Sequence, residues 1–221
     1  MKSYRLSDIS VETWVQGGPR DIEELVGSVV LVEVFQVNCP GCFLHALPKA
    51  IQLYQQYANN DLVIIGLATA FEDYDKNTLD NLKKLVKTGE VIGETLKALT
   101  HQGFLTDDKL DWRLPFTVGM DRVVPETEPI TQEKIMDVTK KAVPNFELLP
   151  EHKKQMVLNQ VNSYLQQKTM KAETFERFAL QGTPSAILFD RQGDVRDVSF
   201  GQQEHLPVLI EQYLATDQQS S

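Results

Sequence analysis

The sequence predicts an α/β fold in which a buried sheet carries a pair of thiols at the end of one strand. Residues 29–35 and 62–68 are almost continuous apolar runs rich in valine, isoleucine and leucine, which is typical of strands buried on both faces. Residues 43–54, between them, combine good helix formers with apolar side chains at helical spacing. A strand, a helix and a second strand in this order indicate a right-handed crossover between parallel strands.

The two thiols are Cys39 and Cys42, the only cysteines in the chain, and they lie just before this helix. The first turn of a helix has unpaired N–H groups and a partial positive charge, so the usual cysteine pKa of about 8.5 can fall to roughly 3.5–7.5 there. Cys39 is therefore the expected nucleophile and Cys42 the resolving thiol. Pro40 suits a helix start, and Gly41 adds no bulk beside the sulfurs. Two cysteines can also be ordinary core residues, but this placement favours redox function.

The other elements of the domain follow from the same signals, with apolar runs for strands and apolar residues at helical spacing for helices. Glycine and proline mark the breaks, as in the hairpin turn at residues 191–194. In chain order we predict short edge strands at 9–11 and 13–15, a helix at 78–99 broken at Gly89 and Gly93, a strand at 112–121, a short helix at 172–180, hairpin strands at 185–190 and 195–200, and a last helix at 205–214.

Residues at about 122–171 differ from the rest of the chain in being polar, helical and punctuated by prolines. Thr131 is a candidate cap for one helix, and residues 151–167 carry apolar side chains at helical spacing. Both apolar stripes are narrow, so each helix is expected to be half exposed. We interpret this segment as a helical insertion.

Composition limits the classes of partner. Hydrophobic residues make up 42% of the chain and charged residues 24%, which is ordinary for a globular protein. The net charge of −9 argues against a nucleic-acid partner. We also expect no membrane partner and a cytoplasmic location, because no apolar stretch approaches a signal peptide or the roughly 18 residues of a membrane span. In that reducing compartment a dithiol is more often catalytic than structural.

Three motifs occur in a characteristic order. Cys39-Pro40-Gly41-Cys42 follows a buried strand, Gly182-Thr183-Pro184 precedes the hairpin, and an Asp-x-x-Gly turn runs from Asp190 to Gly193. Together they resemble the thioredoxin-like superfamily, and in particular its redoxin branch, which includes the TlpA-like thiol–disulfide oxidoreductases.

The resemblance covers residues 6–121 and 172–214. It implies a three-layer α/β/α sandwich with a mixed central sheet, and a single thioredoxin-like domain over residues 1–221 that contains the insertion. It also implies that Pro184 is cis and packs against the dithiol, and that the backbone of Thr183 pairs with an incoming peptide strand. The alternative is an ordinary trans turn proline.

Glu33 lies six residues before Cys39, inside the apolar strand. Burial disfavours the charged carboxylate, so its pKa should be raised, which makes it a plausible general base for Cys42. The resemblance points the same way, because thioredoxins have a buried acid at this offset that helps to deprotonate the resolving thiol. The alternative is that Glu33 pairs with a lysine or arginine at a strand end.

The sequence departs from the resemblance at three positions. His45 lies three residues after Cys42, where many TlpA-like proteins have glutamate; it could tune the thiols by its charge or be an ordinary half-exposed helix residue. Asn38 stands where a tryptophan often precedes the first cysteine. Pro48 follows Cys42 by six residues rather than five. These departures concern redox potential and partner more than fold.

Three other functions compete with disulfide exchange. A thiol peroxidase of the peroxiredoxin type usually has threonine and proline where Gln36 and Val32 stand. A copper or zinc site at Cys39, Cys42 and His45 lacks a visible fourth ligand. A partner-binding module with a vestigial dithiol is not distinguished by the insertion.

The sequence therefore predicts an enzyme, a thiol–disulfide oxidoreductase. Cys39 attacks a substrate disulfide, and Cys42, deprotonated with help from Glu33, resolves the mixed disulfide. No cofactor or metal is required, because the dithiol carries the two electrons. The expected partners are a disulfide-containing protein or small thiol substrate and an external reductant or oxidant. The direction of electron flow depends on potentials that the sequence does not encode visibly.

Overall fold

The computed structural model describes residues 4–57 and 61–215, so the ends of the predicted domain at 1–3 and 216–221, and residues 58–60, lie outside the described residues. The chain divides into two compact units, Met1–Val123 with Ala172–Ser221 and Val124–Lys171. The second unit corresponds to the insertion predicted at about 122–171. That both units form a single domain stays a prediction.

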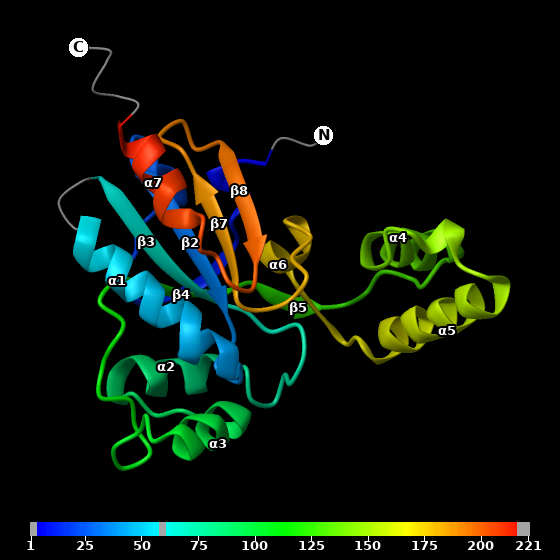
Figure 1. Ribbon diagram of the computed structural model, residues 1–221, viewed down its shortest axis with the longest axis horizontal. Helices are drawn as coiled ribbons and strands as arrows, with labels where there is room; N and C mark the ends of the chain where they lie inside the picture. Colours follow the sequence, from blue (N-terminus) through cyan, green and yellow to red (C-terminus); the bar gives the residue numbers. More distant parts are fainter. Residues whose placement is uncertain (1–3, 58–60, 216–221) are drawn as a thin grey trace. The chain divides into compact units, whose positions relative to one another are not determined.

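The first unit is built on a six-stranded sheet with the order β1-β4-β3-β2-β7-β8 (Figure 1). Its strands are β1 Val11–Gln16, β2 Val29–Phe35, β3 Leu62–Ala68, β4 Thr117–Asp121, β7 Ser185–Phe189 and β8 Val195–Phe200. The pairs β2–β3 and β3–β4 are parallel, whereas β1–β4, β2–β7 and β7–β8 are antiparallel. The predicted mixed sheet is therefore confirmed, with β2 near its centre.

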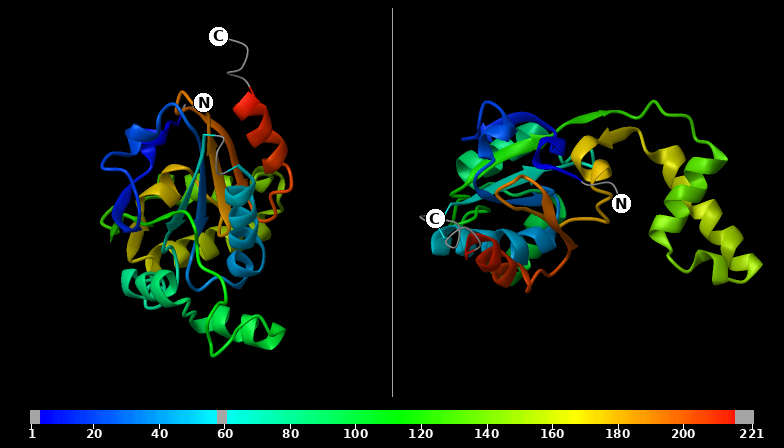
Figure 2. Two further views of the ribbon diagram at one scale, coloured as in Figure 1. Left: turned by 90° about the vertical axis from the view of Figure 1, so that its left-hand side faces the viewer. Right: turned by 90° about the horizontal axis from the view of Figure 1, so that it is seen from above.

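Side chains of β2 alternate between two apolar clusters, one on each face of the sheet. Leu31 and Phe35 belong to the cluster that contains Cys39, Cys42 and the helix over residues 40–57, called the dithiol helix below. Val30 and Val32 belong to the cluster on the opposite face. Figure 2 (left) shows helices α1 and α7 on one side of the sheet and the lead-in segment on the other. Because both faces of β2 are covered, its sequence is apolar throughout, and the predicted α/β/α sandwich is confirmed.

The helices of this unit lie where helices were predicted, with the helix predicted at 78–99 divided into α2 and α3, and they differ from the predictions at their ends. They are α1 Leu47–Tyr57, α2 Leu79–Thr88, α3 Gly93–Gln102, α6 Glu173–Arg177 and α7 Leu206–Ala215. Gly89 ends α2 with a left-handed φ of 78°, which explains the predicted break. The strand predicted at 112–121 was too long, because β4 begins at Thr117, two residues after Pro115. No helix in the described part of the chain combines the length and hydrophobicity that a membrane crossing requires.

The second unit is a pair of helices, α4 Gln132–Ala142 and α5 Glu151–Gln167. The short strands β5 Val123–Pro125 and β6 Met170–Ala172, which were not predicted, pair where the chain enters and leaves it. Thr131 caps α4, as predicted, by accepting a hydrogen bond from the Lys134 N–H at 3.1 Å. Among its described residues, the buried apolar cluster is Ile135, Val161 and Leu165, and Phe146 is a further buried hydrophobic side chain. So small a core leaves much of the stability of this unit to polar contacts.

The main polar contact of the second unit is an ion-pair network around Glu126. The Glu126 carboxylate lies 3.2 Å from Lys168 Nζ and 3.3 Å from Lys134 Nζ, and the Glu126 and Lys168 side chains are 9% and 8% exposed. Burial acts to raise the pKa of Glu126, but hydrogen bonds from the Glu128 N–H and from the two lysines outweigh it and lower the pKa below its ordinary 4.5. A lowered pKa means that the network stabilises the unit above pH 4.5 and is lost as the pH falls through the folded-state pKa.

Replacing Glu126 with glutamine is therefore expected to destabilise the second unit at pH 7 by about 1–3 kcal/mol, because it leaves buried lysine donors without their charge partner. Hydrogen exchange of the α4 and α5 amides measures this loss directly. The difference from wild type should shrink as the pH falls below 4.5. Glu151→Gln is the control, because Glu151 is 89% exposed and should change exchange very little. Equal effects of the two variants would contradict the assignment.

Candidate active site

The two cysteines lie where β2 gives way to the dithiol helix, which begins at Pro40. Cys39 and Cys42 are joined by a disulfide with their Cα atoms 5.4 Å apart. Cys39 is 8% exposed and Cys42 is fully buried, so Cys39 is the cysteine that has surface open to solvent. The Cys42 N–H points at Cys39 Sγ, 3.2 Å away. A main-chain donor at this position favours negative charge on Cys39, as expected for the attacking sulfur.

The first turns of this helix are wider than predicted. Cys42–Ala46 forms a π-helical turn, in which the Leu47 N–H donates to the Cys42 carbonyl oxygen five residues earlier. Pro48, the next residue, has no N–H to donate and would crowd the carbonyl of an ordinary α-helical turn. A π turn contains one residue more than an α turn. It therefore accommodates the additional residue that separates Pro48 from Cys42 in this sequence.

The Gly182-Thr183-Pro184 segment lies against the dithiol. The Thr183–Pro184 peptide bond is cis, and the Thr183 carbonyl oxygen is 3.6 Å from Cys39 Sγ. A Cβ added at Gly41 would lie 3.8 Å from Pro184 Cδ, so the glycine and the proline are in close contact. The structure thus brings together the residues predicted to bind substrate, Pro40 and Gly41 on one side and Thr183 and Pro184 on the other. Their part in binding stays a prediction.

Glu33 is buried in the middle of β2, with 2% of its surface exposed. It lies on the same face of the strand as Leu31 and Phe35 and so faces the dithiol helix. Its sheet neighbours are Gly66 on β3 and Ala186 on β7, which leave room for the carboxyl group.

Burial alone raises the pKa of Glu33 well above its ordinary value, as the sequence predicted. Within residues 4–57 and 61–215, the Glu33 Oε1 atom has no hydrogen-bond partner and Glu33 forms no ion pair, so the alternative of a lysine or arginine partner finds no support. A buried acid with an unpartnered oxygen and a raised pKa is a candidate for proton transfer.

His45 is the remaining predicted residue. Its side chain is exposed on the π turn and makes no hydrogen bond or ion pair with other described residues. Among those residues, no group of three or more histidine, cysteine, aspartate or glutamate side chains is placed to hold a metal ion.

Gln36 is a buried residue whose structural contribution was not predicted. Its Nε2 donates to the Glu72 carbonyl oxygen at 3.2 Å, and its Oε1 accepts from the Thr183 hydroxyl at 3.1 Å. Gln36 therefore joins the loop after β3 to the loop that carries Pro184. The sequence signal was a polar residue directly after a fully buried strand, which requires hydrogen-bond partners.

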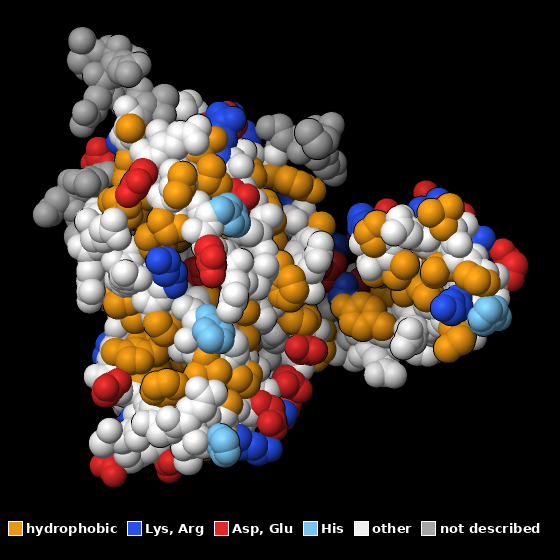
Figure 3. Space-filling model, viewed as in Figure 1, with side chains coloured by type: hydrophobic (Ala, Val, Ile, Leu, Met, Phe, Trp, Pro, Cys, Tyr) orange, Lys and Arg blue, Asp and Glu red, His pale blue; other side chains and the backbone are white. Residues whose placement is uncertain are grey.

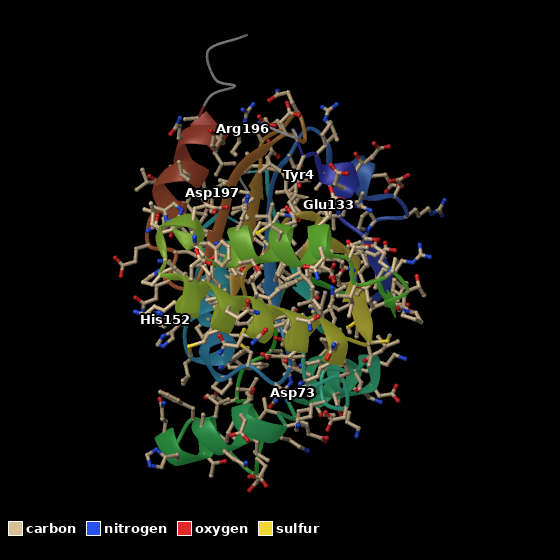
Figure 4. All side chains as sticks on the ribbon, turned by 90° about the vertical axis from the view of Figure 1, so that its right-hand side faces the viewer. Tyr4, Asp73, Glu133, His152, Arg196 and Asp197 are labelled. Atoms are coloured by element: carbon tan, nitrogen blue, oxygen red, sulfur yellow. A yellow bond between two sulfur atoms is a disulfide. The ribbon has the colours of Figure 1, made fainter. Side chains whose placement is uncertain are left out.

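Asn38 is the second residue that was missed. Its backbone N–H donates to Asn77 Oδ1 at 3.0 Å, and its side-chain Nδ2 donates at 2.6 Å to Asp73, which is labelled in Figure 4. Its Oδ1 accepts from the Glu94 N–H at 2.7 Å. Asn38 thus caps α3, whose own N-cap residue, Ile92, offers no side-chain acceptor. An isoleucine at a helix start was the available signal for a cap supplied from elsewhere.

Gly93 lets this contact form. Its φ is +57°, and an added Cβ would lie 2.3 Å from Asn38 Oδ1. Gly93→Ala should therefore both strain the backbone and displace α3 from the cysteine loop, lowering the free energy of unfolding by about 2–4 kcal/mol. Gly103→Ala is a matched control at the other end of α3. Gly103 has φ +72° but nothing within 4 Å, so only backbone strain of about 1–2 kcal/mol is expected. Urea unfolding of both variants measures the difference, and equal losses would contradict the clash.

A cavity of about 360 Å³ lies beside the first turns of the dithiol helix. Hydrophobic side chains gather on this part of the surface, over the start of α1 and around α3 (Figure 3). The apolar lining residues include Phe43, Leu44, Pro48, Leu99, Phe104 and Trp112. None of the predicted site residues lines this cavity.

Comparison with known proteins identifies the fold. No family model matches the chain, and no curated protein is similar to it. Among solved structures, a thiol-disulfide isomerase from Corynebacterium glutamicum is 25% identical with a TM-score of 0.56, and the match covers 97% of each chain. A thioredoxin-like superfamily protein is 20% identical with a TM-score of 0.56, covering 96% of each chain. A thioredoxin-like protein in its oxidised form is 13% identical with a TM-score of 0.52, covering 97% of this chain and 98% of that one.

These similarities confirm the fold that the three motifs implied. The chain has a thioredoxin-like fold of the kind found in thiol–disulfide oxidoreductases, and it carries a cysteine pair at disulfide distance at the start of a helix.

Proposed function

We propose that this thioredoxin-like protein exchanges protein disulfides through the Cys39–Cys42 pair. The observation that carries the proposal is the setting of Cys39: a slightly exposed sulfur that faces the Cys42 N–H and lies 3.6 Å from the Thr183 carbonyl oxygen. The similarity to a thiol-disulfide isomerase supports the same reaction class.

The first step begins from the reduced dithiol. The Cys39 thiolate attacks one sulfur of the substrate disulfide, so that a Cys39–substrate S–S bond forms and the substrate S–S bond breaks. The displaced substrate sulfur leaves as a thiolate and takes a proton from solvent. The Cys42 N–H stabilises the attacking thiolate, and Pro184 packs against Gly41 beside it.

The second step releases the substrate. Glu33 accepts the proton of the Cys42 thiol, and the resulting thiolate attacks Cys39 Sγ in the mixed disulfide. The Cys39–Cys42 disulfide forms and the second substrate thiolate leaves. The substrate has gained the two electrons that the dithiol lost, and an external thiol reductant restores the dithiol. Running in reverse, the same steps oxidise a substrate dithiol.

The test uses the wild-type protein, reduced with dithiothreitol and freed of reductant. On mixing with insulin, one insulin disulfide should be reduced for each chain whose two cysteines become oxidised, as counted by thiol labelling and mass spectrometry. Equilibration with glutathione buffers then gives the potential of the pair. Insulin left intact while hydrogen peroxide is consumed would overturn the proposal in favour of a thiol peroxidase.

A further inference from the structure

Gln36 is the first residue after β2, and both ends of its side-chain amide are hydrogen-bonded. The residue is 1% exposed. Its main chain continues from the paired end of the strand, where the Phe35 carbonyl oxygen accepts the Thr69 N–H at 2.8 Å. From this fixed position Nε2 donates to the Glu72 carbonyl oxygen at 3.2 Å, and Oε1 accepts from the Thr183 hydroxyl at 3.1 Å.

These two partners determine which way the amide of Gln36 points. The Glu72 carbonyl oxygen can only accept, so it requires Nε2 on its side and leaves Oε1 facing Thr183. Oε1 can also only accept, so the Thr183 hydroxyl has to donate its hydrogen to Gln36. The half-buried Thr183 side chain is thereby held in one direction. The Glu72 carbonyl oxygen has a second donor in Asn77 Nδ2 at 2.9 Å, so loss of the amide would not leave it unpaired.

The main chain of Thr183 borders the reactive sulfur. Its carbonyl oxygen lies 3.6 Å from Cys39 Sγ. The residue before it is held separately, because the Ser185 hydroxyl donates to the Gly182 carbonyl oxygen at 2.8 Å. Gln36 holds Thr183 itself, so it is the buried side chain that acts on the carbonyl facing the sulfur.

Cys39 Sγ therefore lies between two opposing main-chain dipoles. The Cys42 N–H, 3.2 Å away, favours the thiolate. When the disulfide is reduced, the Thr183 carbonyl oxygen can accept from the S–H of the thiol, but it presents its negative end to a thiolate. A carbonyl held at this position favours the thiol. A less stable thiolate makes the reduced dithiol a stronger electron donor.

We propose that Gln36 is a positioning residue: by binding the Thr183 hydroxyl it holds the Thr183 carbonyl beside Cys39 and so biases the cysteine pair toward donating electrons. This inference rests on the proposed function and deepens it, because it names a contact that sets the direction of disulfide exchange. Without Gln36 the carbonyl is free to turn away from the sulfur, the thiolate becomes more stable and the pair becomes more oxidising.

The test measures how fast iodoacetamide alkylates Cys39 of the reduced full-length protein as the pH is varied, with the labelled cysteine identified by mass spectrometry. In Gln36→Leu the midpoint of this profile should fall by about half a unit to one unit, the size expected for one hydrogen bond to the thiol. The equilibrium with glutathione should shift toward reduced protein. Thr183→Val removes the same hydrogen bond from its other side and should give the same shift, and the double variant should shift no further.

Two controls separate positioning from a general loosening of the loop. Thr183→Ser retains the hydroxyl and should keep the wild-type midpoint. Ser185→Ala removes another hydrogen bond of this loop, at Gly182 rather than at Thr183, and should leave the midpoint unchanged. Other titratable groups of the region, Glu33, Cys42, His45 and the acids at 72–75, are the same in every variant, so a shift reports the carbonyl.

Three results would overturn the inference: a wild-type midpoint in Gln36→Leu, additive shifts in the double variant, or an equal shift in Ser185→Ala. If Gln36→Leu does not fold, Thr183→Val against Thr183→Ser tests the same contact. Alkylation requires no disulfide substrate, so the two proposals can fail separately. Insulin reduction with an unshifted Gln36→Leu profile rejects this inference alone, whereas the expected shift in a protein that leaves insulin intact rejects the proposed function alone.

Discussion

Cys39→Ser is expected to abolish disulfide reduction, lowering the rate by more than about a thousandfold. Serine keeps the size and position of the side chain, but its hydroxyl is almost never ionised near neutral pH and cannot form a disulfide with substrate. Insulin reduction with an excess of dithiothreitol, corrected for the uncatalysed rate, measures the loss. Residual activity above that correction would show that Cys39 is not the attacking sulfur.

Cys42→Ser is the matched control, because it removes the other sulfur and leaves the attacking one in place. Attack should still occur, but the mixed disulfide cannot be resolved internally. One substrate molecule should therefore accumulate on Cys39 of each chain and be visible by mass spectrometry under non-reducing conditions. If Cys39→Ser rather than Cys42→Ser trapped substrate, the two cysteines would have to exchange functions. That outcome would conflict with their burial, because Cys42 is fully covered.

The parts of the fold that the sequence revealed are those determined by local pattern. Strands β2 and β3 were recognised because burial on both faces requires an unbroken apolar run, and Gly89 ended α2 where a left-handed residue was needed. The dithiol was located because the cysteines stand at the junction of such a strand with a helix. Strand β4 was predicted too long because an apolar run does not show where hydrogen bonding to its neighbours begins.

The features that escaped prediction depend on contacts between distant segments. Asn38 caps α3 from a position far earlier in the chain, and Gln36 reaches the Pro184 loop, so the local sequence shows that each residue or helix end needs a partner but does not identify that partner. The position of Pro48 was noticed as a departure, but the π turn that accommodates it became evident only from the Leu47 hydrogen bond to Cys42.

Glu33→Gln is expected to increase stability and to slow the second chemical step. The carboxylate is buried with an unpartnered oxygen, and burial raises its pKa. Below pH 4.5 the Glu33 carboxyl is protonated in both the folded and the unfolded protein and costs the fold no stability. Because its folded-state pKa is raised, stability is lost as the pH rises through the folded-state value. Glutamine has nearly the same shape and no charge. In the oxidised protein, the variant should be more stable than wild type by about 1–3 kcal/mol at pH 8 and similar to wild type at pH 4.5.

The contrasting variant is Asp121→Asn. Burial also raises the pKa of Asp121, but its carboxylate accepts hydrogen bonds from the Thr69 hydroxyl and from the N–H groups of Thr174 and Phe175. Asparagine would replace one carboxylate oxygen with an NH2 group, which donates and therefore cannot accept these hydrogen bonds. This variant should lose about 1–3 kcal/mol of stability, whereas Glu33→Gln should gain it. Urea unfolding at both pH values distinguishes the two buried acids, and a loss of stability in Glu33→Gln at pH 8 would reveal a partner for that carboxylate.

The kinetic effect of Glu33→Gln shows whether Glu33 acts as a general base or is a buried acid with no part in the reaction. If Glu33 is the proton acceptor, its removal leaves Cys42 to lose its proton to solvent, so resolution of the mixed disulfide at pH 7 should slow by about a hundredfold, the lower end of the roughly 10²–10⁴-fold that a positioned base contributes. The attack by Cys39 should change little, so mixed disulfide should accumulate transiently in quenched samples. Raising the pH should restore the rate, because the thiol then ionises without assistance. A variant that gained stability but resolved the mixed disulfide at the wild-type rate would leave Glu33 with an electrostatic cost and no part in proton transfer.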